Sequence, residues 1–192
     1  MNQRLRRWVN IAILGAAALA VAWILKPVWM PTAPPRASAL PHAVSVTAPL
    51  SVGQPAPAFA LETAEGTTVS LAALRGRPVI LNFWATWCPW CKQELPAFES
   101  VKRRYGSRIA LYGVDIQESP STVRAWLRHH RLDYPVLLDT TGGVAAAYAV
   151  EAVPTTVFIG PDGRIAAIHT GAFSGASAIL PYVREAMGAG GR

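Results

Sequence analysis

Two cysteines separated by two residues are the first feature of this sequence that could do chemistry. They form the run Cys88-Pro89-Trp90-Cys91, and the 192-residue chain has no other cysteine. Two thiols at this spacing can close a reversible disulfide, so the pair predicts thiol–disulfide exchange. A structural zinc site usually needs four ligands, and a haem c attachment needs a histidine where Lys92 stands.

The cysteines stand where a strand passes into a helix. Residues 79–84 are an apolar run typical of a buried strand, and the residues after Cys91 are mostly good helix formers, so we expect a helix from Cys88 to Tyr105. Cys88 would then lie at a helix N-terminus, where unpaired N–H groups favour a thiolate, and Pro89 suits the first turn. We therefore expect Cys88 to be an exposed attacking thiolate and Cys91 a more buried resolving thiol.

The run Phe83-Trp84-Ala85-Thr86-Trp87-Cys88-Pro89-Trp90-Cys91 resembles the active-site segment of thioredoxin-fold proteins. With Leu81-Asn82 before it and Lys92-Gln93-Glu94-Leu95-Pro96 after it, it is similar to the TlpA/ResA-like branch. That branch comprises membrane-anchored, extracytoplasmic thiol–disulfide oxidoreductases, including those that serve cytochrome c maturation. The resemblance covers about residues 51–188 and implies an α/β thioredoxin fold, a central mixed sheet flanked by helices, with an N-terminal hairpin and an α/β insertion.

Glu94 is the candidate proton-transferring residue. It follows Cys91 by three residues, so the two share a helix face, and it matches the active-site glutamate of ResA-like proteins. It could raise the pKa of the thiols or relay a proton to Cys91; the alternative is a solvated first-turn carboxylate that favours the helix dipole. Asn82 stands where cytoplasmic thioredoxins have a buried aspartate. A neutral amide cannot act as a base, so that task moves to Glu94 or to water.

Candidate substrate-binding residues lie on both sides of the cysteines. The resemblance implies that Pro154 is a cis proline facing the cysteine pair, and that the Val153 backbone pairs with an extended substrate peptide. Trp87 and Trp90 would offer an apolar landing surface, and Pro89 lies between the cysteines with Trp90.

The remaining elements are read from apolar periodicity and turn residues. A turn at Glu65-Gly66 predicts a hairpin formed by residues 55–61 and 67–71. Further strands are expected at 109–114, 134–138, 157–159 and 165–169, and helices at 123–130, 144–148 and 174–187. Residues 115–150 correspond to the α/β insertion that the resemblance implies. His169, on a strand, is expected to be an ordinary surface residue.

The first fifty residues differ in composition from the rest. Residues 1–7 form a basic tail, 8–26 a candidate transmembrane signal-anchor, and 27–50 a linker rich in proline and alanine. As a helix, the apolar run would be roughly 27 Å long, close to the hydrocarbon thickness of a bilayer. The thioredoxin-like domain is expected at 51–188 and a flexible tail at 189–192.

The charge pattern predicts the orientation of that anchor. Five basic residues and no acidic one precede residue 37, whereas the remainder carries 13 basic against 11 acidic residues. The basic tail should stay in the cytoplasm, which would put the C-terminal domain in the periplasm, tethered to the inner (cytoplasmic) membrane. A cleaved signal peptide, which would release a soluble periplasmic protein, is the alternative. The net charge of +7 is concentrated at the N-terminal end, so it is poor evidence for nucleic-acid binding.

Together these features predict a protein disulfide oxidoreductase, most simply a reductase whose only redox group is the Cys88–Cys91 pair, with no metal or other cofactor. Its partners would be protein thiols and disulfides, and the resemblance implies a membrane electron donor of the DsbD or CcdA type. Two alternatives stay open: an oxidant that forms disulfides, and a copper-binding thioredoxin-fold chaperone. The second would need a histidine or methionine near the cysteines, and none is adjacent in the sequence.

Overall fold

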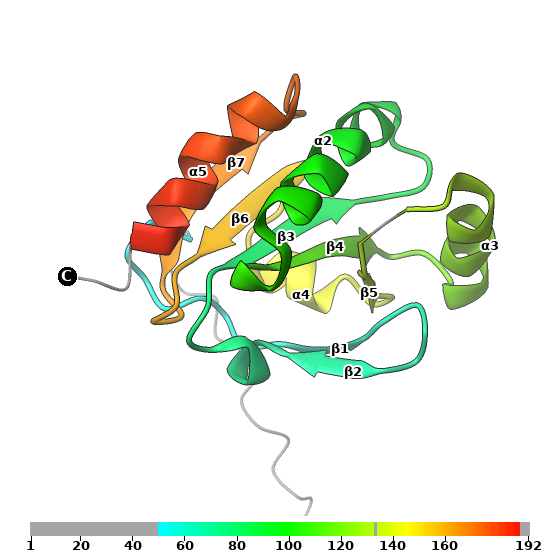
Figure 1. Cartoon of the computed structure of the whole chain (residues 1–192). Coiled ribbons are helices and arrows are strands. Elements are labelled where there is room, and N and C mark those ends of the chain that lie inside the picture. The colour runs from blue at the N-terminus through cyan, green and yellow to red at the C-terminus, as the bar shows by residue number, and fades with distance from the viewer. Residues whose placement is uncertain (1–49, 133, 189–192) are drawn as a thin grey trace, which may run out of the picture. The chain divides into compact units, whose positions relative to one another are not determined.

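The computed structural model describes residues 50–132 and 134–188. Its centre is a mixed five-stranded sheet with the strand order β5-β4-β3-β6-β7 (Figure 1). The central strand β3 pairs in parallel with β4 and antiparallel with β6. The five strands are β3 (Val79–Trp84), β4 (Ala110–Ile116), β5 (Val136–Asp139), β6 (Thr155–Ile159) and β7 (Ile165–Thr170). The predicted thioredoxin-type sheet is confirmed, and β6 and β7 pair antiparallel at one side of it.

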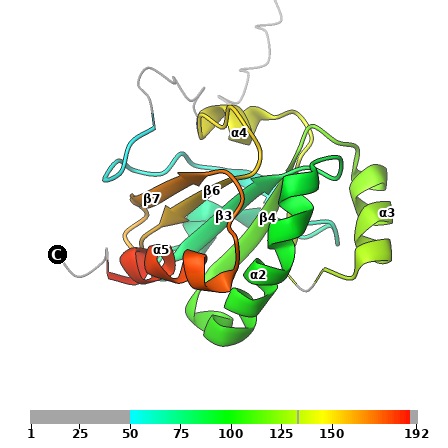
Figure 2. The same cartoon turned by 90° about the horizontal axis from the view of Figure 1, so that it is seen from above.

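All six residues of β3 are buried, because helices or loops cover both faces of the sheet. One core cluster joins β3 to the helices α2, α3 and α5, and a second joins the other face to α4 and to the N-terminal hairpin (Figure 2). A strand buried on both sides carries apolar residues on both faces, which explains why residues 79–84 do not alternate with polar ones. Asn82 is the one polar residue of β3, and it is also buried. The helices are α2 (Pro89–Tyr105), α3 (Pro120–His130), α4 (Gly143–Ala147) and α5 (Ala176–Gly188).

The predicted N-terminal hairpin is present but shorter than expected. Strands β1 (Ala60–Glu62) and β2 (Thr68–Ser70) pair antiparallel over three residues each. Gly66 takes a φ of 89° in the connecting turn, a conformation that glycine adopts without strain. The described residues also contain two short 3₁₀ helices, η1 (Leu71–Leu74) and η2 (Gly106–Arg108).

Residues 115–150 form the α/β unit that the sequence predicts. Ser119 caps α3 by accepting a hydrogen bond from the Thr122 backbone N–H at 3.1 Å. The chain then adds β5 in parallel to the edge of β4 and continues into α4. This unit places the carboxyl ends of β3, β4 and β5 at one edge of the sheet, and the cysteines follow β3 at that edge.

The predicted basic tail, transmembrane segment, most of the linker and the C-terminal tail lie outside the described residues. Within residues 50–132 and 134–188, none of the helices combines the length and the apolar character needed to span a bilayer.

Candidate active site

Cys88 is the N-cap of α2, and it is joined to Cys91 by a disulfide with an S–S distance of 2.11 Å. The backbone N–H of Cys91 donates to the Cys88 Sγ at 3.1 Å, and Pro89 occupies the first turn, where no N–H is needed. The strand-to-helix junction therefore directs a helix-terminal donor at the first sulfur. After reduction, the same donor can stabilise a thiolate on Cys88.

The expectation that Cys88 is exposed is wrong for the disulfide form. Cys88 is only 2% exposed and Cys91 is fully buried. The carbonyl oxygen of Val153 lies 3.8 Å from the Cys88 Sγ and covers it from the side of β6. The exposed surface at this place comes from Trp87 and Trp90, which are 68% and 62% exposed and confirm the expected apolar surface. The two tryptophans, and not the sulfurs, therefore form the solvent-exposed surface at this place.

The Val153–Pro154 peptide bond is cis, as the resemblance implies. It directly precedes β6 and so brings the Val153 carbonyl against the disulfide. Thr155 holds the end of this loop, because its Oγ1 donates to the Ala152 carbonyl at 2.8 Å. A proline at position 154 has no N–H to direct at the sulfurs.

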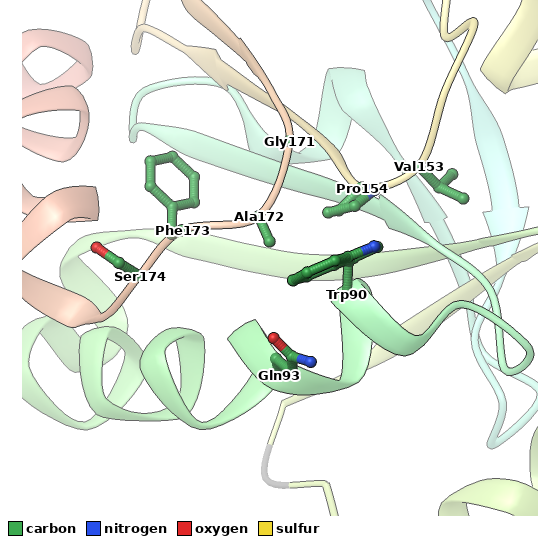
Figure 3. Close-up of a pocket in the computed structure, with 8 residues that line it drawn as sticks. All are labelled: Trp90, Gln93, Val153, Pro154, Gly171, Ala172, Phe173 and Ser174. Atoms are coloured by element: carbon green, nitrogen blue, oxygen red, sulfur yellow. The ribbon is translucent and has the colours of Figure 1, made fainter.

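Two hollows flank this proline loop, and Val153 lines both. In the first, Trp90 and Gln93 of α2 face Pro154 and the segment 171–174 (Figure 3). Its volume is about 540 Å³. The second, of about 380 Å³, lies on the side of Trp87 and is lined by Ala85, Trp87, Ile116, Gln117, Val150, Glu151, Ala152 and Val153. An extended chain can thus cross the disulfide with side chains in a hollow on either side.

Glu94 is fully buried, so its interpretation as a solvated first-turn carboxylate is wrong. Its Oε1 accepts from the Asn82 Nδ2 at 2.8 Å, and its Oε2 accepts from the Phe173 backbone N–H at 2.9 Å. Burial raises the pKa of Glu94 to about 7, and the hydrogen bonds from Phe173 and Asn82 only partly oppose this. One turn after Cys91, the chain therefore holds a carboxyl group that changes its charge near neutral pH.

Asn82 connects Glu94 to two further buried residues. Its Nδ2 also reaches the Thr156 Oγ1 at 3.2 Å, and its Oδ1 accepts from the Tyr134 hydroxyl at 3.4 Å. Burial, reinforced by the charge of Glu94, raises the pKa of Tyr134 well above its usual value, so Tyr134 acts as a neutral donor. The neutral amide thus orients the carboxyl group without adding a charge.

Sequence reasoning did not identify Tyr134, Thr156 or Phe173 as part of the site. They lie 40 or more residues after Glu94, and nothing in their local pattern marks them as partners of that residue. The weak signal available was Tyr134 at the start of an apolar strand, where a buried hydroxyl needs an acceptor.

The sequence suggested that His169 is an ordinary surface residue, and this prediction is wrong. The histidine is partly buried, its ring stacks on Phe173 with centroids 4.0 Å apart, and its Nδ1 lies 3.3 Å from the Tyr182 hydroxyl. Burial lowers the pKa of His169. Its packing supports Phe173, whose backbone N–H holds Glu94.

The copper-binding alternative requires a histidine or methionine near the two cysteines. Among the described residues, no group of three or more histidine, cysteine or acidic side chains is arranged to hold a metal ion. What the geometry does offer is two sulfurs, a helix-terminal donor, a buried acid and two hollows beside the cis proline.

Comparisons with known proteins agree with this geometry. The AhpC/TSA family matches residues 52–168. The chain is 40% identical over 122 residues to the thioredoxin-like protein YneN of Bacillus subtilis, covering 62% of this chain and 71% of that protein. It is 37% identical over 123 residues to the thiol–disulfide oxidoreductase ResA of the same organism, covering 64% of this chain and 69% of ResA.

Solved structures show the same fold. StoA from Bacillus subtilis superposes with a TM-score of 0.59 at 27% identity, covering 66% of this chain and 96% of StoA. A thiol:disulfide interchange protein from Chlorobium tepidum TLS superposes with a TM-score of 0.62 at 26% identity, covering 72% of this chain and 99% of that one. The chain therefore belongs to the AhpC/TSA family, and within it to the ResA-like thiol–disulfide oxidoreductases.

Proposed function

We propose that this thiol–disulfide oxidoreductase works as a reductase of protein disulfides outside the cytoplasm. The observation that carries the direction is the buried acid Glu94, one helical turn after Cys91 and held by Asn82 and Phe173. The reduction potential of a dithiol rises when its reduced form is stabilised as a thiolate, as in strong oxidants. A buried carboxyl group disfavours a second negative charge beside it, and this keeps the reduced pair a stronger electron donor.

In the first step the Cys88 thiolate attacks one sulfur of a substrate disulfide. The Cys88–substrate bond forms, the substrate disulfide breaks, and the displaced substrate sulfur takes up a proton as a thiol. The Cys91 N–H donor stabilises the attacking thiolate, and Cys88 must move out from under the Val153 carbonyl to reach the substrate.

In the second step Cys91 loses its proton and attacks the Cys88 sulfur. The Cys88–Cys91 disulfide forms, the mixed disulfide breaks, and the substrate leaves with its second thiol, reduced by two electrons. Glu94 is placed to take the Cys91 proton, because it shares a face of α2 with Cys91 and its pKa of about 7 lets it exchange a proton near neutrality.

Substrate binding is assigned to the surface around the cis proline. The Val153 backbone would pair with an extended peptide, Pro154 would keep an N–H away from the sulfurs, and Trp87, Pro89 and Trp90 would supply apolar contact. The two hollows beside Val153 fit side chains on either side of the reacting cysteine.

The proposed location is inferred from the sequence, and the proposed electron donor is inferred from the family resemblance. The basic and apolar segments 1–7 and 8–26 support a single inner-membrane anchor with the domain in the periplasm, or a cleaved leader and a soluble periplasmic protein. Re-reduction of the Cys88–Cys91 disulfide would require a membrane dithiol donor of the DsbD or CcdA type. Cytochrome c maturation is the pathway that the resemblance favours, with the paired cysteines of the apoprotein as client.

The opposite direction is the second candidate, and one observation favours it. The Cys91 N–H on the Cys88 Sγ, at 3.1 Å, stabilises a thiolate and so favours an oxidant. The donor at Cys88 raises the reduction potential of the pair, whereas the buried Glu94 lowers it. Equilibrating the protein with glutathione or dithiothreitol buffers measures the potential that results from both. We expect a potential nearer to the roughly −270 mV of thioredoxin than to the roughly −120 mV of DsbA. A value at the DsbA end would overturn the reductase assignment.

Clients can be identified by stalling the second step. The Cys91→Ala variant keeps the attacking sulfur and should accumulate mixed disulfides at Cys88, whereas the matched Cys88→Ala variant should accumulate none. Captured proteins that carry closely spaced cysteine pairs on the periplasmic side would support the proposed client class. Recovery of cytoplasmic proteins alone from intact cells would contradict the proposed location.

A further inference from the structure

A second buried acid lies at the end of β4, and the exchange mechanism does not use it. Asp115 is only 1% exposed, and it is paired in register with Trp84, the last residue of β3. The chain reaches the cysteines four residues after Trp84. Asp115 is therefore buried at the sheet edge from which the cysteine loop, residues 85–88, departs.

Glu118, three residues after Asp115, holds that loop with both of its oxygens. The Thr86 backbone N–H donates to the Oε2 at 2.5 Å, and the Thr86 hydroxyl donates to the Oε1 at 2.6 Å. Thr86 lies two residues before Cys88, and the Cys88 N–H donates to the Ala85 carbonyl at 3.1 Å. Because charge-assisted hydrogen bonds are short and directional, this pair of bonds fixes the backbone that presents Cys88.

Asp115 has neither a cation nor a donor as partner in the described part of the chain. Neither of its carboxyl oxygens accepts a hydrogen bond from an N–H or O–H group. Burial raises the pKa of Asp115 to about 8, helped by a hydrogen bond to the Glu118 side chain, by the charge of Glu118 and by that of Asp139 on β5. Asp139 is itself engaged, since its Oδ2 accepts from the Ala145 N–H at 2.7 Å. A protonated Asp115 has Glu118 as its acceptor.

We propose that Asp115 and Glu118 share one proton and together position the Cys88 loop through Thr86. Asp115 donates its carboxyl proton to Glu118, and Glu118 keeps its two bonds to Thr86. When the shared proton is lost to solvent, the buried Asp115 and the partly exposed Glu118 both carry a negative charge, Glu118 withdraws from Thr86, and the loop loosens. Both acids are positioning residues, and the inference rests on disulfide exchange at Cys88, whichever direction that exchange takes.

The test uses the reduced full-length protein and a small disulfide, oxidised glutathione, between pH 6 and 10. The rate of exchange is divided by the Cys88 thiolate fraction, measured by absorbance at 240 nm, so that ionisation of the thiol is removed from the profile. For the unmodified protein we expect this corrected rate to fall about tenfold as the pH rises through 8, the size expected for losing one hydrogen bond to a charged group.

Three variants and one matched control distinguish a role in positioning the Cys88 loop from a general loss of structure. Asp115→Asn keeps a donor toward Glu118 at every pH, so the alkaline fall should disappear. Thr86→Val removes the hydroxyl and should lower the corrected rate about tenfold at every pH, whereas Thr86→Ser keeps both donors and should restore it. Glu185→Gln, at an exposed acid on α5, is the matched control and should follow the unmodified profile.

Cooperative thermal unfolding of each variant shows that it is folded before its rate is interpreted. The proposal is overturned if Asp115→Asn retains the same alkaline fall, or if Thr86→Val exchanges at the unmodified corrected rate. A low potential or a high one leaves this inference intact, so its failure is distinct from failure of the reductase proposal.

Discussion

Glu94 and Asp115 are both buried acids near the cysteine loop, but their surroundings differ. Glu94 accepts two hydrogen bonds, from Asn82 and from the Phe173 backbone, and its pKa rises to about 7. Asp115 accepts none, faces the acids Glu118 and Asp139, and its pKa rises to about 8. The comparison shows that hydrogen-bond donors oppose the effect of burial on the pKa of Glu94, whereas neighbouring acids add to that effect at Asp115.

The difference in surroundings matches a difference in task. Glu94 lies one helical turn from Cys91, where a proton must leave and return during exchange. Asp115 acts on the cysteines through Glu118 and Thr86. In the proposal, the proton on Asp115 keeps Glu118 in place, and Glu118 holds the loop. One acid is thus suited to proton transfer and the other to holding a loop.

The largest expected effect on the rate of disulfide reduction comes from replacing the attacking sulfur of Cys88. Cys88→Ser should lower disulfide reduction by about a thousandfold or more, because a hydroxyl is not ionised at neutral pH and forms no disulfide. Insulin reduction followed by turbidity checks this. Retention of the unmodified rate by the serine variant would remove the basis for assigning a role to either acid.

The next effect is the pH dependence of stability contributed by Asp115. Its pKa is 3.8 when unfolded and about 8 when folded, so the folded state binds the extra proton and stability falls as pH rises across that window. Four pH units correspond to roughly 5 kcal/mol. Asp115→Asn should therefore flatten the fall in unfolding free energy between pH 4 and pH 8, measured by urea denaturation at a series of pH values. An unchanged slope would mean that Asp115 is ionised in the folded protein.

Glu94 should give a similar slope of unfolding free energy against pH, but over a narrower pH window, so that its total contribution is smaller. Its pKa moves from 4.5 to about 7 on folding, so its contribution falls between those values and levels off above pH 7, a total of roughly 3 kcal/mol. Glu94→Gln should remove this part alone and leave the slope between pH 7 and 8, which belongs to Asp115. If both variants lost the same part of the curve, the two acids would titrate as one coupled group.

The same Glu94→Gln variant tests the role of its charge in exchange. Without a carboxylate beside Cys91, the reduced pair should be easier to ionise, so the Cys88–Cys91 potential should become less reducing above pH 7. Redox equilibrium with glutathione at pH 6 and pH 8 measures this. An identical shift at both pH values would point to lost packing instead of lost charge.

The smallest expected effect lies at the surface. Trp90→Ala should raise the KM for a peptide disulfide about fivefold, because one exposed aromatic contact contributes on the order of 1 kcal/mol. The rate with oxidised glutathione, which cannot span the hollows beside Val153, should stay within a factor of two. An equal loss with both substrates would place Trp90 in the exchange chemistry and not in peptide binding.

Local pattern was enough to predict most of the elements. The strand at 79–84, the helix that follows the cysteines and the turn at Glu65-Gly66 are all where the sequence predicts them. Boundaries moved by one to a few residues, most in the N-terminal hairpin, where pairing ends after three residues. Strand ends depend on partners that neighbouring residues do not reveal.

By itself, the sequence determined that two cysteines stand at a strand-to-helix junction and that tryptophans surround them. The family resemblance added that Pro154 faces the cysteines. Only the tertiary structure decided that Glu94 is buried against Phe173, 79 residues away, that Glu118 holds Thr86, and that Cys88 is covered by Val153. The physical reason is that helix and strand preferences act among neighbours in the chain. The burial that sets a pKa comes from whichever distant segments pack together.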